Sequence, residues 1–165
     1  MANYDHPKGF EPFGQLLRVN IYEAGSACYP GDLVTLASDG QVDPASAGSL
    51  ILGVCLSYAS AAGESIAVAD HPAQQIVGQV AASEIDAQTD IGNCADILAT
   101  AGNSTYKASR QEVDGSTQSG SATAQLRILG IENKSNNVLG EFVDVVCAIN
   151  EHQFGPAQAN AGVGV

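Results

Sequence analysis

The chain has 165 residues, with 18 acidic and 6 basic side chains that give a formal charge of −12. This charge argues against direct binding of nucleic acid, which needs Lys and Arg to displace counterions, and against binding to anionic membrane surfaces. No apolar run reaches the ~18 residues of a transmembrane helix, and the first ten residues lack the apolar stretch of a secretory signal. The length fits one domain, and the many Gly, Ala, Ser and Thr residues favour a turn-rich β fold over a helical bundle.

The first fourteen residues, MANYDHPKGFEPFG, are predicted to form an extended N-terminal arm because they contain two Pro and two Gly. Two roles are open for Phe10 and Phe13 in this arm. They fold back onto the protein's own core, or they anchor the arm on a neighbouring subunit, where buried aromatic side chains supply much of the binding energy.

The following segment, residues 15–24, alternates apolar and polar side chains. Alternation is typical of a strand that buries one face. We therefore expect a strand here whose apolar face is formed by Leu17, Val19 and Ile21 and whose other face is formed by Arg18, Asn20 and Tyr22.

The centre of the sequence, residues 30–70, is predicted to form short β-strands joined by turns. The expected strands are 33–36, 50–56 and 65–69, and Gly-containing turns separate them. Turn signals recur every ~8–12 residues, as they do in all-β sandwiches and barrels.

Further strands are expected in the C-terminal half, at residues 76–80, 106–113, 125–131 and 141–149. The last two form a hairpin, and both faces of 141–149 are largely apolar, so this strand is central or packs against another subunit. Residues 81–97 are expected to form a loop or short helix, and 116–123 a flexible loop. The predicted fold is thus all-β, a small β-barrel or β-sandwich, with an arm (1–14), a single β domain (15–152) and a flexible C-terminal tail (153–165).

The sequence indicates no catalytic, cofactor or metal site, and we do not expect an enzyme. The three histidines (His6, His71 and His152) are scattered, and no hydrolase, metalloprotease or nucleotide-binding motif is present. Oxygen-bearing side chains cluster between residues 86 and 96, but their spacing is not that of an EF-hand, so we expect a loop. The four cysteines are far apart, and buried free thiols are favoured over two disulfide bridges, with Cys55 and Cys147 in the core.

Three short motifs resemble a known family. They are Gly31-Asp32-Leu33-Val34, Leu52-Gly53-Val54 and Ala62-Gly63-Glu64, with a looser match over residues 126–131 and 142–149. Together they resemble the core of tailed-bacteriophage capsid decoration (cement) proteins, and the main match covers about a quarter of the chain. The resemblance implies a small β-barrel protein made in the host cytoplasm and placed on the outer capsid surface. Its partners would be the major capsid protein and itself, as a homotrimer.

On this interpretation the contact segments are the N-terminal arm and the tail, with the contact residues Phe10, Phe13, Leu16, Leu17 and Phe154. The alternative is a carbohydrate- or ligand-binding β-module of a phage fibre or another virion component. Sugar sites use exposed aromatic platforms, and the absence of Trp counts against this alternative.

Overall fold

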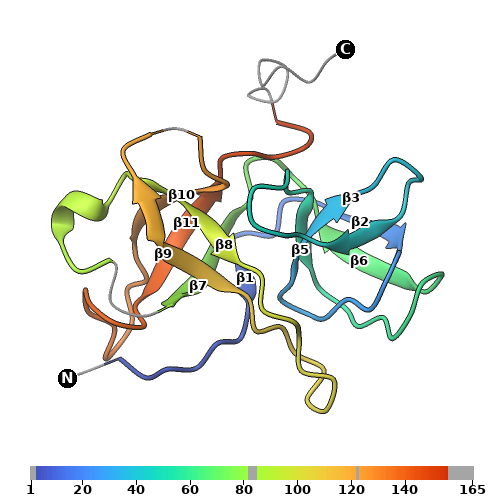
Figure 1. Ribbon diagram of the computed structural model, residues 1–165, viewed down its shortest axis with the longest axis horizontal. Helices are drawn as coiled ribbons and strands as arrows, with labels where there is room; N and C mark the ends of the chain where they lie inside the picture. Colours follow the sequence, from blue (N-terminus) through green and yellow to red (C-terminus); the bar gives the residue numbers. More distant parts are fainter. Residues whose placement is uncertain (1–2, 82–84, 122, 156–165) are drawn as a thin grey trace.

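The computed structural model describes residues 3–81, 85–121 and 123–155. It is all-β, as predicted, and the described residues contain a single short 3-10 helix, η1 (Gln88–Asp90). The strands form a closed barrel and a second sheet, which lie on the left and the right of Figure 1.

Five strands close the barrel: β7 (Gln75–Ala81), β11 (Asp144–Ile149), β10 (Leu126–Ile131), β8 (Cys94–Leu98) and β9 (Glu112–Ser119). All neighbours are antiparallel except β7 and β9, whose parallel pairing closes the ring. β11 lies between β7 and β10, which confirms that the strand with two apolar faces is central. The hairpin of β10 and β11 is also confirmed.

The second sheet contains β2 (Val19–Glu23), β6 (Ser65–Ala69), β5 (Gly53–Cys55), β3 (Leu33–Leu36) and β4 (Val42–Pro44), in this spatial order. Every pair in it is antiparallel. β3 and β6 have the predicted bounds, because apolar runs and glycine turns mark both ends of these strands. β2 and β4 are the two edges of the sheet.

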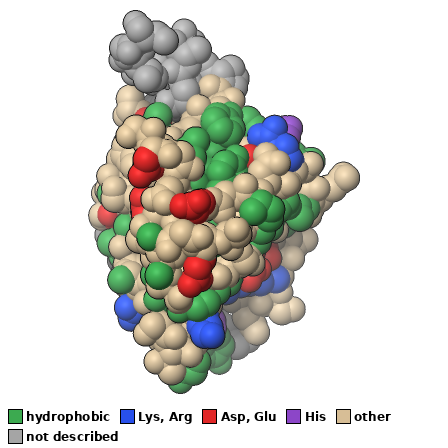
Figure 2. Space-filling view, turned by 90° about the vertical axis from the view of Figure 1, so that its right-hand side faces the viewer, with side chains coloured by type: hydrophobic (Ala, Val, Ile, Leu, Met, Phe, Trp, Pro, Cys, Tyr) green, Lys and Arg blue, Asp and Glu red, His purple; other side chains and the backbone are tan. Residues whose placement is uncertain are grey.

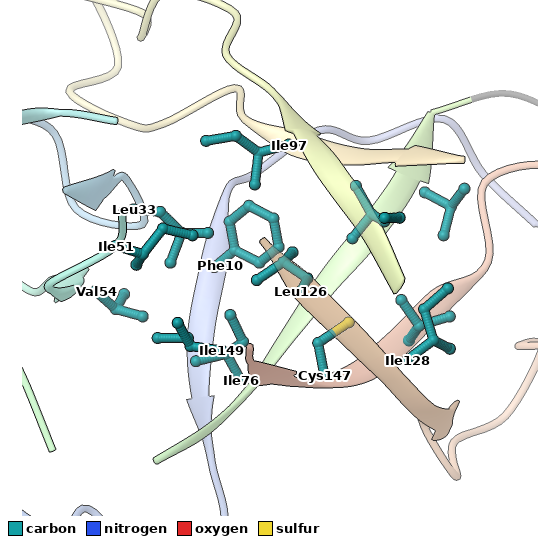
Figure 3. Close-up of a cluster of buried hydrophobic side chains, with 14 of the residues drawn as sticks. Phe10, Leu33, Ile51, Val54, Ile76, Ile97, Leu126, Ile128, Cys147 and Ile149 are labelled. Atoms are coloured by element: carbon teal, nitrogen blue, oxygen red, sulfur yellow. The ribbon is translucent and has the colours of Figure 1, made fainter. Parts of the chain in front are cut away.

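The prediction of an extended N-terminal arm over residues 1–14 needs correction, because part of this segment is a strand of the domain. β1 (Phe10–Phe13) pairs antiparallel with β7 and lies between the barrel and the second sheet (Figure 1). Its first side chain, Phe10, is only 1% exposed and lies at the centre of the main hydrophobic core (Figure 3). Opposite it, Gly78 leaves room for the ring, since a Cβ at this position would lie 2.3 Å from the Phe10 side chain.

Two hydrophobic clusters hold the fold together. The larger one fills the barrel and extends to the near side of the second sheet, where Leu33 and Val54 contribute (Figure 3). The smaller one belongs to the second sheet and is formed by Ala24, Cys28, Val34, Val42, Leu52, Cys55, Ala59, Ile66 and Val68. All four cysteines are free and buried, as favoured by the sequence.

The structure differs from the expected elements in the polar region before β10. Residues 116–119, expected in a flexible loop, belong to β9, and the turn expected at residues 113–115 is strand. β8 was not predicted. Of the loop or helix expected over 81–97, residues 82–84 lie outside the described residues. Of the expected tail, residues 153–155 are described and 156–165 lie outside the described residues.

Candidate interaction surface

The side chains of β2 point the opposite way from the arrangement that their alternation suggests. Arg18, Asn20 and Tyr22 turn toward the protein and converge on Asp70, the residue that follows β6. Arg18 Nε lies 2.7 Å from Asp70 Oδ1, and Asn20 Nδ2 donates to Oδ2 over 2.8 Å. The Tyr22 hydroxyl donates to the same Oδ2 over 2.5 Å. The polar side chains of this segment therefore lie on the side that faces Asp70, where Arg18 and Asn20 are still exposed and Tyr22 is half-buried.

Asp70 supplies the reason for this orientation. Its side chain is fully buried, and a buried carboxylate is very costly unless charged or polar donors surround it. Burial alone would raise the pKa of Asp70, but the hydrogen bonds from Tyr22, Arg18 and Asn20 outweigh burial and lower it. Burial and the bond to Asp70 raise the pKa of Tyr22 to about 12, so the phenol keeps its donor hydrogen.

The apolar side chains of the same segment point away from Asp70 and lie in solvent. Leu17, Val19 and Ile21 are all exposed, Ile21 by 69%. We call these three residues the β2 surface. Figure 2 shows the side of the molecule that carries the second sheet, where hydrophobic side chains gather in several places between polar ones. An exposed row of large aliphatic side chains on one strand is a candidate interaction surface.

The backbone of β2 is also accessible, because β2 is an edge strand. Among the described residues, its named pairing is with β6 alone. On its other side, the chain makes a bridge to β4 just after the strand ends, where Ala24 lies beside Val42 and Gly25 N–H donates to Val42 O. Unpaired edges of this kind are sites where another chain adds a strand or packs.

The five predicted contact residues do not form one group. The structure corrects the prediction that Phe10 contacts a partner. Phe10 lies in the protein's own core, because β1 pairs with β7, and it is not accessible to a partner. Phe13, Leu16, Leu17 and Phe154 are each 40–50% exposed. Phe13 and Leu16 precede the β2 surface in the chain, whereas Phe154 lies near His152, with ring centroids 6.2 Å apart.

The prediction missed Val19 and Ile21 as accessible residues. Their spacing is visible in the sequence, and the alternation predicts that this face is buried. The alternation gives the two faces of a strand without saying which of them is covered. The deciding feature is the buried carboxylate of Asp70, which needs polar donors and lies 52 residues from Arg18 in the chain, so the local pattern does not reveal it.

The chain leaves the barrel through His152, which is buried beside the second sheet. Backbone bonds on both sides hold it, from Ile51 N–H to Glu151 O and from Gln153 N–H to Ile51 O. Its Nδ1 accepts from the Phe154 N–H over 3.0 Å, so the imidazole is neutral with its proton on Nε2. Nε2 has no hydrogen-bond partner among the described residues, and burial lowers the pKa of His152 to about 4.

Metal-ligating residues do not gather anywhere in the described part of the chain: no three His, Cys, Asp or Glu side chains are placed to hold an ion. Asp90, in the oxygen-rich segment, instead accepts from Ala87 N–H and from the Gln118 side chain. Within the described residues, no helix is long and apolar enough to cross a membrane. The sequence matches no model of a known protein family and none of the curated proteins with which it was compared.

Proposed function

We propose that this protein is a structural protein of a phage virion that binds the outer surface of the capsid and stabilises the head shell. The observation that carries the proposal is the β2 surface, which exposes large aliphatic side chains on an edge strand of a protein with charge −12. The acidic remainder of the surface keeps such a protein soluble at high concentration. The apolar strand provides a site at which contact area can be buried.

The location of the family-like motifs supports the proposal. The motifs that contain Leu33-Val34 and Leu52-Gly53-Val54 lie on β3 and β5, which are hydrogen-bonded neighbours, and Ala62-Gly63-Glu64 is the turn that leads into β6. Segments that are separate in the sequence thus lie together in the second sheet, where β6 separates β5 and β3 from β2. The partners in this proposal are the major capsid protein and the protein itself, as a homotrimer.

The proposed mechanism depends on binding alone and requires no catalysed reaction. A protein that binds assembled shells and not dissociated capsid subunits stabilises the shell by mass action. A shell presents the same site many times, so a trimer that engages several subunits gains avidity beyond the affinity of one contact.

Binding to purified shells tests the proposal. We expect Ile21→Asp to weaken co-sedimentation with shells at least ~10-fold, since a carboxylate must be desolvated at the contact. Val138→Asp is the matched control, because Val138 is also an exposed β-branched residue but lies on the β10–β11 turn. Mass spectrometry of virions should find a copy number close to that of the major capsid protein.

Two results would overturn the proposal. One is the absence of the protein from purified particles. The other is equal binding of Ile21→Asp and the unmodified protein to shells, which would exclude the β2 surface as the contact.

A further inference from the structure

Three charged side chains meet at the turn that joins β10 to β11. Glu132 directly follows β10, Lys134 lies on the turn, and Asp144 is the first residue of β11. Lys134 Nζ lies 2.8 Å from Glu132 Oε2 and is in direct contact with Asp144 Oδ2. One amine thus lies between two carboxylates of the same hairpin.

The Asn137 side chain fixes the backbone around these groups. Its Nδ2 donates to Glu132 O and Asp144 O, and its Oδ1 accepts from Asp144 N–H. Glu132 N–H also donates to Asp144 O, and Lys134 N–H donates to Glu132 O. The amine and the carboxylates are therefore held together by a rigid turn. Well-oriented groups held in this way can react as if each were present at about 10⁵–10⁸ M.

The surroundings of Asp144 disfavour a charged carboxylate. The residue is only 8% exposed, and its Oδ1 has no hydrogen-bond partner among the described residues. A buried carboxylate oxygen without a donor is costly, whereas the carbonyl oxygen of an amide carries less charge and costs less to leave unpaired. Conversion of this carboxylate into an amide would remove a cost that the ion pair leaves in place.

The other basic groups nearby do not replace Lys134. Lys8 and His6 line the cavity that also borders Lys134 and Asp144. Among the described residues, however, the one ion pair of Lys8 is with Glu11, at 3.8 Å, and His6 forms none. Lys134 is therefore the amine that is placed against Asp144.

We propose that Lys134 and Asp144 join in an intramolecular isopeptide bond, with Glu132 as the group that transfers the proton. This proposal does not depend on capsid binding. Partial burial lowers the pKa of Lys134, but hydrogen bonds to Asp144 and Glu132 outweigh burial and raise it, so the pair is ionic before it reacts. A proton that passes from Nζ to Oδ2 gives an amine and a carboxylic acid without changing the total charge. The neutral amine is the nucleophile, and because each chain reacts only once, a small population of this form is sufficient.

The reaction is a condensation that releases water. Nζ attacks Cγ of Asp144 and the Nζ–Cγ bond forms, while Glu132 accepts a proton from Nζ and returns it to Oδ2. The Cγ–Oδ2 bond then breaks, and Oδ2 leaves as water. Of the three protons of the ammonium, one stays on the amide nitrogen and two leave with the water. Oδ1 becomes the amide oxygen, and the net charge is unchanged because one positive and one negative charge are lost together.

Mass spectrometry of the full-length protein tests the proposal. The intact protein should be lighter than its sequence requires by the mass of one water molecule. A protease specific for glutamate cuts the backbone of the unfolded chain after Glu132, Glu141 and Glu151. Peptides 133–141 and 142–151 should nevertheless stay joined, because the bond connects Lys134 to Asp144.

Three variants test the assigned roles, each checked for folding by circular dichroism. Lys134→Arg keeps the positive charge but has no nucleophilic amine, so it should lose no water and its two peptides should separate. In a time course after cell-free synthesis, Glu132→Gln should form the bond at least ~100-fold more slowly, because the proton carrier is lost. Lys8→Arg is the matched control and should form the bond as the unmodified protein does, since Lys8 pairs with Glu11 instead.

The proposal fails if the unmodified protein releases peptides 133–141 and 142–151 separately, whether or not its mass shows the loss of water. It also fails if the two peptides stay joined in Lys134→Arg, or if Lys8→Arg abolishes the bond. Equal rates for Glu132→Gln and the unmodified protein would overturn the role of Glu132. None of these results bears on shell binding, because the three residues do not belong to the β2 surface.

Discussion

Arg18 and Asp70 form an ion pair in which Arg18 Nε lies 2.7 Å from Asp70 Oδ1, with the Asp70 side chain fully buried and the Arg18 side chain partly exposed. The pair joins the start of β2 to the end of β6. Because side chains alternate along a strand, fixing Arg18 on the side that faces Asp70 turns the neighbouring aliphatic residues to the other side, which lies in solvent. The accessible β2 surface is thus a consequence of one buried carboxylate.

Replacing the buried carboxylate should destabilise the protein. We expect Asp70→Asn to lower the free energy of unfolding by about 2 kcal/mol or more, because its amide hydrogens face the donors of Asn20 and Tyr22. Urea unfolding followed by circular dichroism measures the change. Asp86→Asn, at an exposed position, is the matched control and should stay within about 0.5 kcal/mol. Equal stability of the two variants would show that the Asp70 network does not hold β2.

His152 should make stability depend on pH. Its pKa is 6.5 in the unfolded chain and about 4 in the folded protein, where burial disfavours the charged form. The unfolded state therefore binds more protons between these values. The contribution of His152 is complete above pH 6.5 and is lost as the pH falls toward 4, by about 2 kcal/mol between pH 7.5 and pH 5.

The control experiment must separate the effect of His152 on pH-dependent stability from the effect of buried carboxyl groups. Burial raises the pKa values of Asp32, Glu112 and Glu151, which act in the opposite direction as the pH falls. His152→Asn keeps an acceptor for the Phe154 N–H but does not titrate. Urea unfolding from pH 7.5 to pH 5 should thus show a steeper loss of stability for the unmodified protein than for His152→Asn. Parallel curves would contradict the prediction.

Phe10 and Phe13 offer a comparison within one strand. Phe10→Ala should cost about 3–5 kcal/mol, because it empties the centre of the barrel core. Phe13→Ala should cost about 1 kcal/mol or less, since this ring is 40% exposed. Thermal and urea unfolding of both variants measure the difference. If the two substitutions cost the same, β1 does not pack as described.

The thiols should be inert in the folded protein. Burial raises the pKa values of Cys28 and Cys147 to about 12 and that of Cys55 to about 11, and it also raises the pKa of Cys94. Thiolate is the reactive form, so little of it exists at neutral pH. An aromatic disulfide reagent should modify none of the four native thiols within minutes and all four after unfolding. Rapid modification of the native protein would indicate an accessible thiol.

Much of the fold follows from local signals in the sequence. The bounds of β3 and β6 and the β10–β11 hairpin are marked by turn residues and apolar runs that lie within a few positions of each other. The central place of β11 follows from its two apolar faces. These features need no knowledge of distant contacts.

The missed features all depend on distant partners. β1 looks like a loose arm because β7, the strand that orders it, begins more than sixty residues later. The polar segment 116–119 is a strand because β8 pairs with β9. The outward face of β2 depends on Asp70, which lies 52 residues after its partner Arg18 in the chain. Periodicity along one segment contains none of this information.

The position of Phe10 has a consequence for the growing chain on the ribosome. Phe10 is synthesised long before β7 and β11, which border its site, and β11 ends only at Ile149. The strands of the second sheet all lie within residues 19–69 and emerge together much earlier. The nascent chain therefore carries Phe10 without its neighbouring barrel strands until they have been made, and the barrel closes only after β11 has been synthesised.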